Sequence, residues 1–443
     1  MKPEKKDFYW TYIAQIINIG GGVIALPLVL AFWDVITVNN YLILITLMAL
    51  FAIIDGGIRL NLARVATFAI SRKIPEYGST STLILENLHQ HQIFSIMHKL
   101  LLKVSLIGGA SIFSIGVLYL YSSSLPSEFR TNTINWILLS ISQMLFIRNL
   151  SIIGVLQGCG KIALANKLVA AFKGGILFSC IGSVLLGFGL FGFAIGSFIF
   201  STIIFYLTQN IYHQELKKDL IEKKTISVNK VDINQIYKLL LKPSIRLWIV
   251  HGGGFLINRG GILVAGLVLG VAEASSFMLT ITVISVVANL ASVVISTYLP
   301  LLNSIQVSDS KSLLPSIVKK IYTIAYIVFC LGFIGIYFFG DYLLAFIGSE
   351  IKLIENNLLL VLGLVFFLEV THSIAAIYLT TKNEIIFAKA AVLSGLTIVI
   401  FSYFLGATYG ILGLILAQGI VQLIYNNWRW PLLMLRDLRG NFA

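Results

Sequence analysis

Long apolar stretches dominate this sequence and constrain its fold more than any other feature. Twelve of them run for about 19 to 30 residues, and a hydrocarbon core of about 30 Å takes about 20 helical residues to cross. Apolar residues make up 58% of the chain and charged residues only 12%, so there is too little polar surface to cover a soluble core. The sequence therefore predicts an all-α, polytopic membrane protein with twelve transmembrane helices and no room for a catalytic domain. The expected helices are 9–33, 39–58, 100–121, 134–156, 164–187, 190–210, 244–270, 275–304, 320–340, 356–379, 386–405 and 409–427.

Basic residues are distributed unequally between the gaps that separate these helices. One set of gaps holds only Arg130 and Lys352. The other set holds Lys2, Lys5, Lys6, Arg59, Arg64, Arg72, Lys73, Lys99, Lys103, Lys161, Lys167, the run 217–246, Lys311, Lys319, Lys320, Lys382, Lys389, Arg429, Arg436 and Arg439. By the positive-inside rule, both termini are expected in the cytoplasm. The formal net charge of +13 is thereby explained by topology, and no folded basic module for nucleic acid is present in the pattern.

The cysteines and histidines do not indicate a metal site. Cys159, Cys180 and Cys330 are too few for a disulfide framework, and no Cys or His cluster has the spacing of metal ligands. We therefore expect no metal and no cofactor. The basic start of the chain is similar to the flank of a signal peptide, but the apolar run 9–33 is too long for a cleaved signal and is expected to remain as the first helix.

A polar stretch divides the sequence near its middle. Residues 211–242 carry several lysines and acidic residues, as expected for a cytoplasmic connector, and the lysines could also attract anionic lipid headgroups. We predict an N-terminal six-helix lobe (1–212), a cytoplasmic connector (213–243) and a C-terminal six-helix lobe with a short cytoplasmic tail (244–443).

The two halves carry related motifs. The basic turn at 157–161 is matched at 378–382, and the glycine motif at 189–196 is matched at 410–417 with an identical offset. Triple glycines at 20–22 and 252–254 stand near the start of each half, with an offset that is only slightly larger. Three matches in the same order favour an internal duplication, with parallel repeats about an axis normal to the membrane.

Glycine, proline and amide residues mark candidate hinges and a candidate polar lining. The hinge candidates are Gly20, Gly21, Gly22, Pro27, Gly252, Gly253 and Gly254, because bent or broken helices are tolerated where they line protein or a water-filled cavity. Gln15 and Asn18 continue a polar stripe on the first helix, and Gln418 and Gln422 form one on the last. Such stripes fit either a hydrated cavity or polar contacts between helices.

Ionisable residues within the apolar stretches are stronger candidates, because each costs about 2.5–3.5 kcal/mol at bilayer depth even on lenient scales. The candidate substrate-binding cations are Arg148, Lys173 and Arg259, with His251. The candidate coupling or gating residues are Asp55, Glu369 and His372. A local ion pair with Arg59 is the alternative for Asp55, snorkelling is the alternative for Lys173, and ordinary packing is the alternative for both histidines.

The balance of these charges is cationic and favours an anionic substrate. Phosphate is the best match, since a guanidinium group can bind it through two hydrogen bonds. Arg148 and Glu369 are separated by the same offset as the matching basic turns, so the duplication predicts equivalent positions of opposite charge in the two lobes. They could pair in one state of an alternating-access cycle, with protonation of Glu369 weakening the pair. Alternatively, each has a partner in its own lobe, with His372 nearest to Glu369.

Several motifs resemble those of O-antigen flippases, the polysaccharide-transporter branch of the multidrug/oligosaccharidyl-lipid/polysaccharide exporter superfamily. They are Tyr12-Ile-Ala-Gln-Ile-Ile-Asn-Ile-Gly-Gly-Gly with Leu26-Pro27, Ile54-Asp55-Gly-Gly-Ile-Arg59-Leu-Asn-Leu-Ala-Arg64, the Gly-Cys-Gly-Lys161 turn, and Tyr298-Leu-Pro300. The resemblance extends over nearly the whole chain. Members commonly carry an aromatic residue where Gly56 stands here, so the family's pattern does not extend to the surroundings of Asp55.

The resemblance implies two six-helix lobes around a central cavity in the bacterial inner membrane. It also implies transport of an undecaprenyl-diphosphate-linked oligosaccharide from the cytoplasmic to the periplasmic leaflet. The implied coupling ion is H⁺ or Na⁺, and the implied protein partners are the polysaccharide polymerase and chain-length machinery. Two alternatives remain open: a cation-coupled multidrug exporter of the same superfamily, and an O-antigen polymerase or ligase. The enzyme usually needs a sizeable periplasmic loop, whereas the gaps 122–133 and 341–355 are short.

Overall fold

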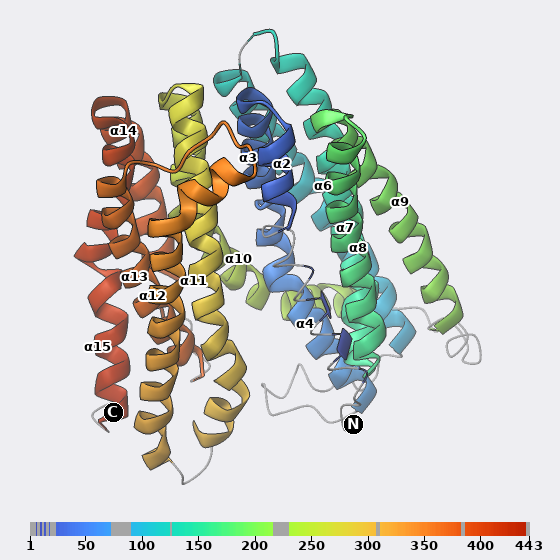
Figure 1. Cartoon of the computed structure of the whole chain (residues 1–443). Coiled ribbons are helices and arrows are strands. Elements are labelled where there is room, and N and C mark those ends of the chain that lie inside the picture. The colour runs from blue at the N-terminus through green and yellow to red at the C-terminus, as the bar shows by residue number, and fades with distance from the viewer. Residues whose placement is uncertain are drawn as a thin grey trace. The chain divides into compact units, whose positions relative to one another are not determined.

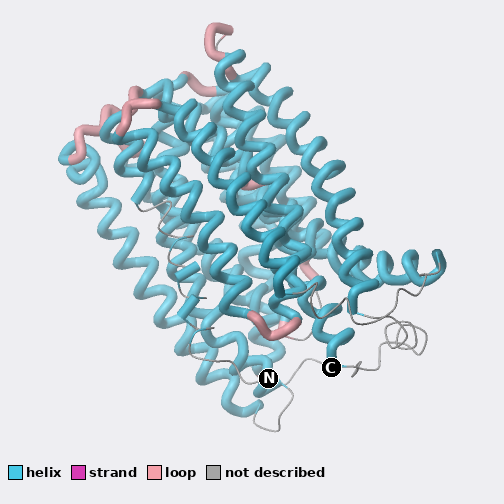
Figure 2. The backbone as a smooth tube through the Cα atoms, turned by 90° about the vertical axis from the view of Figure 1, so that its right-hand side faces the viewer, coloured by secondary structure: helices cyan, strands magenta, loops and turns pink. Residues whose placement is uncertain are grey.

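The computed structural model describes the chain except for residues 1–5, 7, 8, 11, 12, 15, 16, 18–23, 72–89, 125, 216–229, 307–310, 382–385 and 440–443. The described part is helical and contains no strand (Figures 1 and 2). The helices are α2 (Leu26–Phe32), α3 (Val35–Met48), α4 (Phe51–Ser71), α6 (Gln90–Ser123), α7 (Phe129–Gly158), α8 (Ile162–Leu185), α9 (Gly189–Glu215), α10 (Lys230–Val268), α11 (Val271–Gln306), η3 (Lys311–Leu313, a 3-10 helix), α12 (Leu314–Phe346), α13 (Asn356–Thr380), α14 (Ala388–Ile424) and α15 (Asn426–Leu438).

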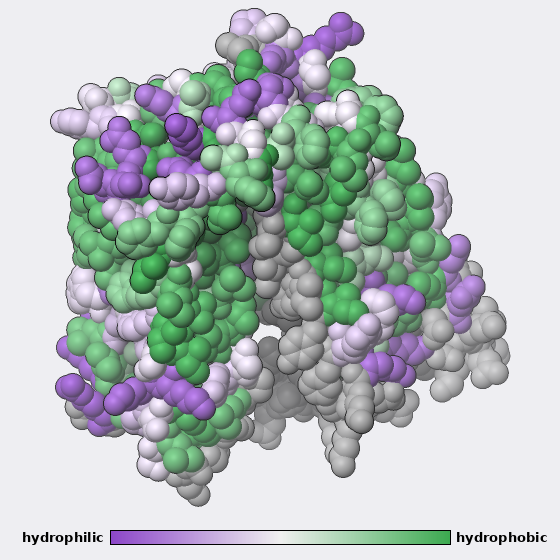
Figure 3. All heavy atoms as spheres, viewed as in Figure 1, coloured by the Kyte–Doolittle hydropathy of each residue, from purple (hydrophilic) through white to green (hydrophobic). Residues whose placement is uncertain are grey.

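Ten helical segments of the described chain are long and apolar enough to cross a membrane. The last of them, Ala388–Leu438, contains both of the final two expected helices, and the first expected helix, 9–33, falls largely outside the described residues. The expected all-α, multi-pass architecture is thus confirmed. The expected count of twelve helices is roughly consistent with these segments. The face of α11–α15 in Figure 3 is hydrophobic in its middle and hydrophilic at both ends, as a bilayer requires.

The chain divides into two compact units. Unit 1 comprises Met1–Val29 and Leu44–His251, and unit 2 comprises Leu30–Ile43 and Gly252–Ala443. Helix α10 begins at Lys230, within the stretch expected to form the connector, and its first part up to His251 belongs to unit 1. The lobe boundaries given by the sequence stay a prediction.

In unit 1, α7 packs against α4, α6, α8 and α9. Glycines allow these close approaches: a Cβ on Gly154 would stand 2.7 Å from Cβ of Leu62 on α4, and one on Gly175 of α8 would stand 2.9 Å from Cβ of Phe200 on α9. The hydroxyl of Ser142 on α7 contacts that of Ser201 on α9. Small residues and hydroxyl contacts are the usual means of holding helices together in lipid, where apolar surface alone gives no preference for a neighbouring helix.

In unit 2, α11 packs against α12 and α13, and α13 packs against α14 and α15. Helix α10 crosses α14 through glycine contacts, because a Cβ on Gly253 would lie 2.6 Å from the carbonyl carbon of Ala391. Ile257 of α10 joins Ile398 and Val421 of α14 in a buried apolar cluster beside this crossing. The close crossing fixes α10 against the helices that carry the polar residues described below.

The glycine motif predicted to open the last helix of each half has the same backbone role in both units. Helix α9 begins at Gly189, with φ 57°. Helix α14 is interrupted at Gly410, with φ 60° and ψ −137°. Only glycine adopts such backbone angles readily. The equal spacing of the motifs therefore corresponds to equivalent local structure.

Helix α3, which links the two units, begins with a capping interaction from Asp34. Its Oδ1 accepts hydrogen bonds from the backbone N–H groups of Ile36 and Thr37 at 3.0 and 3.1 Å, and Oδ2 accepts one from the Thr37 hydroxyl at 2.6 Å. Partial burial raises the pKa of Asp34, but these hydrogen bonds outweigh that effect and hold the pKa below its ordinary value of 3.8. The charged carboxylate thus satisfies N–H groups that the helix itself leaves free.

Candidate substrate and coupling sites

Arg148 lies on α7, the central helix of unit 1. Its guanidinium carbon stands 5.1 Å from the centre of the Phe205 ring on α9. Its Nε is buried without a hydrogen-bond partner, and within the described chain no carboxylate pairs with it. His98 on α6 donates or accepts a hydrogen bond with the hydroxyl of Ser151 at 3.1 Å, one turn after Arg148. The surroundings thus leave the Nε–H of Arg148 able to donate a hydrogen bond.

A second charged group in unit 1 combines α4 and α8. Arg59 Nε lies 3.6 Å from Asp55 Oδ1, as the spacing of four residues predicts. The charges of both residues act on Lys173 of α8, which is partly buried. The three side chains therefore place two basic residues beside one acidic residue.

Arg259 lies on α10 in unit 2 and is partly buried. Across the part of the chain that the structure describes, it makes no hydrogen bond or ion pair. Its guanidinium group is therefore available to an anion from outside the protein. His251, two turns earlier on α10, is exposed and belongs to unit 1.

The hinge candidates of α10 form part of a continuous helix, since α10 runs from Lys230 to Val268 through all three glycines. A Cβ on Gly252 or Gly254 would meet nothing within 4 Å, whereas Gly253 is held against α14. The backbone break of unit 2 is at Gly410. A helix bend at 252–254 is therefore not present in this conformation, and a hinge role there stays a prediction.

Most of the remaining candidates, which belong to the first expected helix, lie in parts of the chain that the structure does not describe. Gln15, Asn18, Gly20, Gly21 and Gly22 lie outside the described residues. Pro27 is exposed in the first turn of α2, and the two residues just before α2 are π-helical.

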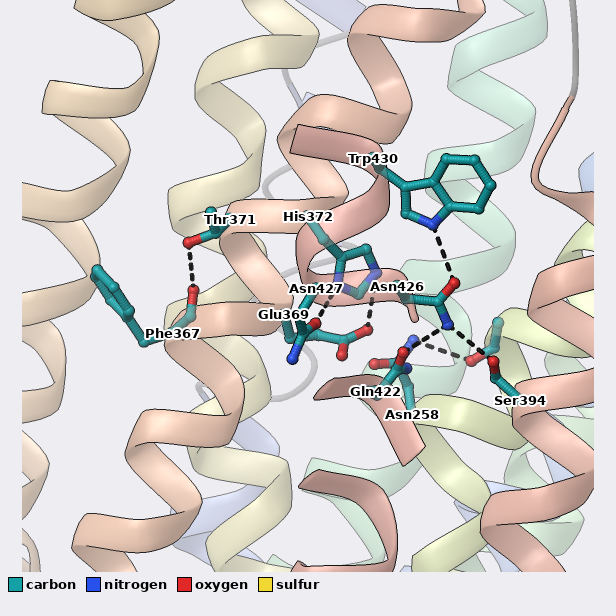
Figure 4. A network of polar contacts seen from close by, with 11 residues as sticks. Asn258, Phe367, Glu369, Thr371, His372, Ser394, Gln422, Asn426, Asn427 and Trp430 are labelled. Carbon is teal, nitrogen blue, oxygen red and sulfur yellow. Dashed lines mark hydrogen bonds and ion pairs between the residues drawn. The ribbon is translucent and has the colours of Figure 1, made fainter. Parts of the chain in front are cut away.

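Glu369 and His372 form the centre of a buried polar network in unit 2 (Figure 4). Both are on α13, and His372 Nε2 lies 3.6 Å from Glu369 Oε1. The other imidazole nitrogen, Nδ1, is 2.9 Å from Oδ1 of Asn427 on α15, and Oε2 of Glu369 is buried without a hydrogen-bond partner. With Nδ1 directed at the asparagine, Nε2 is the imidazole nitrogen that faces Glu369.

A second part of the network orients Gln422 on α14. The indole N–H of Trp430 can only donate, and it donates to Oδ1 of Asn426 at 3.0 Å. The amide nitrogen of Asn426 therefore donates to Oε1 of Gln422 at 2.7 Å and to the Ser394 hydroxyl at 2.9 Å. This sequence of bonds directs Oε1 of Gln422 toward Asn426. The amide nitrogen of Gln422 is left buried without a partner in the described chain, as is that of Gln418 one turn earlier.

Gln418 and Gln422 both lie on α14, which packs against α13, the helix of Glu369. The contact of Gly419 with Val365 brings α14 against α13 one turn before Gln422 and Glu369. Both glutamines are buried. Among the described residues, no group of three or more His, Cys, Asp or Glu side chains is placed to hold a metal ion.

A cavity of about 580 Å³ lies elsewhere in unit 2 and contains none of the predicted site residues. Its lining comes from the first turns of α3, α11 and α13, from the segment before α13, and from the interruption of α14. The lining residues are Val35, Ala272, Glu273, Ser276, Glu350, Ile351, Lys352, Leu353, Ile354, Glu355, Leu358, Tyr409, Gly410, Ile411 and Leu412.

The sequence reasoning missed Phe205 and Asn427, whereas it placed Asn426 in the polar stripe of Gln418 and Gln422. A usable signal was present, because the offset that relates Arg148 to Glu369 also relates Phe205 to Asn426. In unit 1 these positions pair a cation with an aromatic ring. In unit 2 they belong to the amide and carboxylate network. Positions that the predicted repeat relates therefore differ in chemistry between the units. A pairing of Arg148 with Glu369 stays a prediction.

Comparisons with known proteins identify the fold. No family model matches the sequence, and neither does any curated protein. An inward-facing multidrug resistance MATE family transporter of the MOP superfamily matches with a TM-score of 0.65 and 14% identity, over 99% of this chain and 100% of the other. The lipid II flippase MurJ in an inward closed conformation also gives 0.65 and 14%, over 99% and 93%.

A third solved structure is a MOP superfamily transporter from Pyrococcus furiosus, described by a reverse polarity of its binding pocket that suggests a different function. It matches with a TM-score of 0.53 and 15% identity, over 98% of this chain and 94% of the other. The chain therefore has the fold of MOP superfamily transporters.

Proposed function

We propose that this chain, with the fold of a MOP superfamily transporter, is a flippase for an undecaprenyl-diphosphate-linked oligosaccharide such as an O-antigen repeat unit. It would move this lipid from the cytoplasmic to the periplasmic leaflet of the bacterial inner membrane by alternating access, with both chain termini in the cytoplasm. The observation that carries the proposal is the arginine chemistry. Arg259 has no acidic partner in the described chain, and Arg148 has an aromatic neighbour in place of a carboxylate.

A diphosphate is the ligand that this chemistry favours. Its oxygens accept the paired hydrogen bonds that a guanidinium group offers, and its charge offsets the cost of keeping arginine within apolar helices. The lipid II flippase with the same fold supports a lipid-linked substrate. The polysaccharide polymerase and chain-length machinery would then be the partners that receive the product.

Glu369 and His372 are proposed to couple transport to an ion gradient. Protonation of Glu369 would change the net charge of the pair inside a buried network, and such a change alters the relative stability of two conformations. Asp55, already paired with Arg59, would gate the cationic group around Lys173.

A multidrug exporter is the main alternative, and the MATE transporter structure matches equally well. A cationic drug needs unpaired carboxylates. Here, Asp55 has Arg59 beside it and Glu369 has His372 beside it, whereas Arg259 has no acidic partner within the described residues. The charge pattern therefore favours the anionic substrate.

Replacing Arg259 tests the proposal. Arg259→Ala should lower surface polysaccharide by roughly tenfold or more, because hydrogen bonds to a charged group contribute about 1.5–3 kcal/mol each. Arg259→Lys should restore export only in part, since an ammonium lacks the planar pair of donors. Arg436→Ala, which removes an exposed arginine from the last turn of α15, is the matched control. The readouts are surface polysaccharide and the amount of membrane-inserted protein. Full export by Arg259→Ala would remove Arg259 from the substrate site.

A further inference from the structure

The guanidinium group of Arg148 lies over an aromatic ring and, within the described chain, not beside a carboxylate. The ring of Phe205 is 5.1 Å from the guanidinium carbon, within the range of a cation–π contact. A carboxylate in that place would neutralise the charge and occupy the N–H donors. The face of a phenylalanine ring attracts the cation but offers no lone pair, so the N–H groups remain available to a ligand.

Helix α9 presents a second free donor beside this contact. Ser201 of α9 meets Ser142 of α7 about one turn before the contact of Phe205 with Arg148. Gln209 follows Phe205 by four residues and therefore lies on the same face of α9. Its amide nitrogen is buried without a partner, as is Nε of Arg148. Among the described residues, two buried N–H donors on neighbouring helices thus lack an acceptor, and an anion bound between these helices would supply one.

We propose that Phe205 is a positioning residue that holds Arg148 for a phosphate group of the substrate, and that Gln209 is a further donor of the same site. This inference rests on the proposed function, because the phosphate comes from the diphosphate-linked lipid. It adds that α9 of unit 1 contributes directly to anion binding.

Binding of inorganic pyrophosphate to the purified full-length protein in detergent tests the inference. The probe carries the diphosphate chemistry without the lipid or the sugar. Phe205→Leu should weaken pyrophosphate binding by roughly threefold to thirtyfold, the range expected for loss of a cation–π contact. Phe205→Tyr and Phe205→Trp keep a ring and should bind nearly as the wild type. Gln209→Leu should also weaken binding. Phe191→Leu, at an exposed position of α9, is the matched control.

A double-mutant cycle separates positioning from general packing. If Phe205 acts through Arg148, Phe205→Leu should have little further effect in the Arg148→Ala background. Equal losses in both backgrounds, or unchanged binding by Phe205→Leu, would overturn the inference and leave the proposed function intact. A wild-type protein that binds no pyrophosphate would overturn both. If the arginines do not bind the diphosphate, Arg259→Ala and Arg148→Ala should also leave the export of polysaccharide unchanged.

Discussion

Buried charge without an opposite charge is the most informative feature at the scale of single residues. Asp55 and Arg59 form a local ion pair at 3.6 Å, as their spacing on one helix predicts. Arg259 has no such partner in the described chain, although its desolvation is costly. An anion that binds Arg259 would offset this desolvation cost. Arg259 is therefore a better functional candidate than the ion-paired residues.

Glu369 should control the response to a proton gradient, because its carboxylate is buried 3.6 Å from His372 and its charge depends on its proton. Other ionisable side chains on the helices packed against α13 include Arg429 of α15, and Tyr322 and Tyr326 of α12, which both contact Thr371. Glu369→Gln fixes the neutral form with almost unchanged shape. We expect transport by this variant in proteoliposomes to fall to the rate measured without a gradient and to lose its stimulation by an imposed pH gradient.

The control is Glu355→Gln, which changes an exposed carboxylate just before the same helix. An imposed sodium gradient at constant pH provides the second arm. If Glu369→Gln keeps the full stimulation by the pH gradient, the coupling role of Glu369 is wrong.

At the scale of elements, the crossing of α10 and α14 explains why a run of three glycines stands in the middle of a helix. Three consecutive glycines predict weakness in a helix, yet α10 is continuous through them. The reason is specific to the middle residue: the backbone of α14 lies where a Gly253 side chain would be, and Gly395 of α14 faces the Gly253 carbonyl oxygen in return. Small residues on both helices permit the close approach, as in other membrane helix pairs.

The three glycines should therefore differ in their tolerance of a methyl group. Gly253→Ala places Cβ 2.6 Å from a backbone carbon and should destabilise the protein by about 1–3 kcal/mol. Each kcal/mol corresponds to roughly 2–4 °C in the unfolding temperature for a unit of this size. Gly252→Ala meets open space and should be neutral or slightly stabilising, since alanine favours helix by up to about 1 kcal/mol. Thermal unfolding of the purified protein measures both, and equal destabilisation by the two variants would contradict the packing role.

At the scale of the whole molecule, the sequence predicts the architecture more completely than the sites. Apolar stretches are long and repeated, so they identify the helices, and Gly189 and Gly410 support the predicted repeat because each has a backbone conformation that other residues avoid. Phe205 and Asn427 were not predictable in the same way. Their roles depend on which helix faces they share with Arg148 and His372, and that depends on tertiary packing.

The last expected helix also illustrates this limit. Gln418 and Gln422 are recognisable as a polar stripe, but only the bonds from Trp430 through Asn426 determine that the amide nitrogen of Gln422 is left free. Sequence spacing gives the helix face, whereas the direction of each hydrogen bond follows from the neighbouring helices.

The most direct test of the central claim is lipid flipping by the purified protein in proteoliposomes. The substrate is an undecaprenyl-diphosphate-linked oligosaccharide with a labelled sugar, and its exposure is followed with a membrane-impermeant sugar oxidant. The account predicts that the wild type moves the labelled sugar between leaflets, that Arg259→Ala does so at least roughly tenfold more slowly, and that Arg436→Ala matches the wild type. Export of a cationic dye by the wild type, with no flipping of the diphosphate-linked lipid, would contradict it.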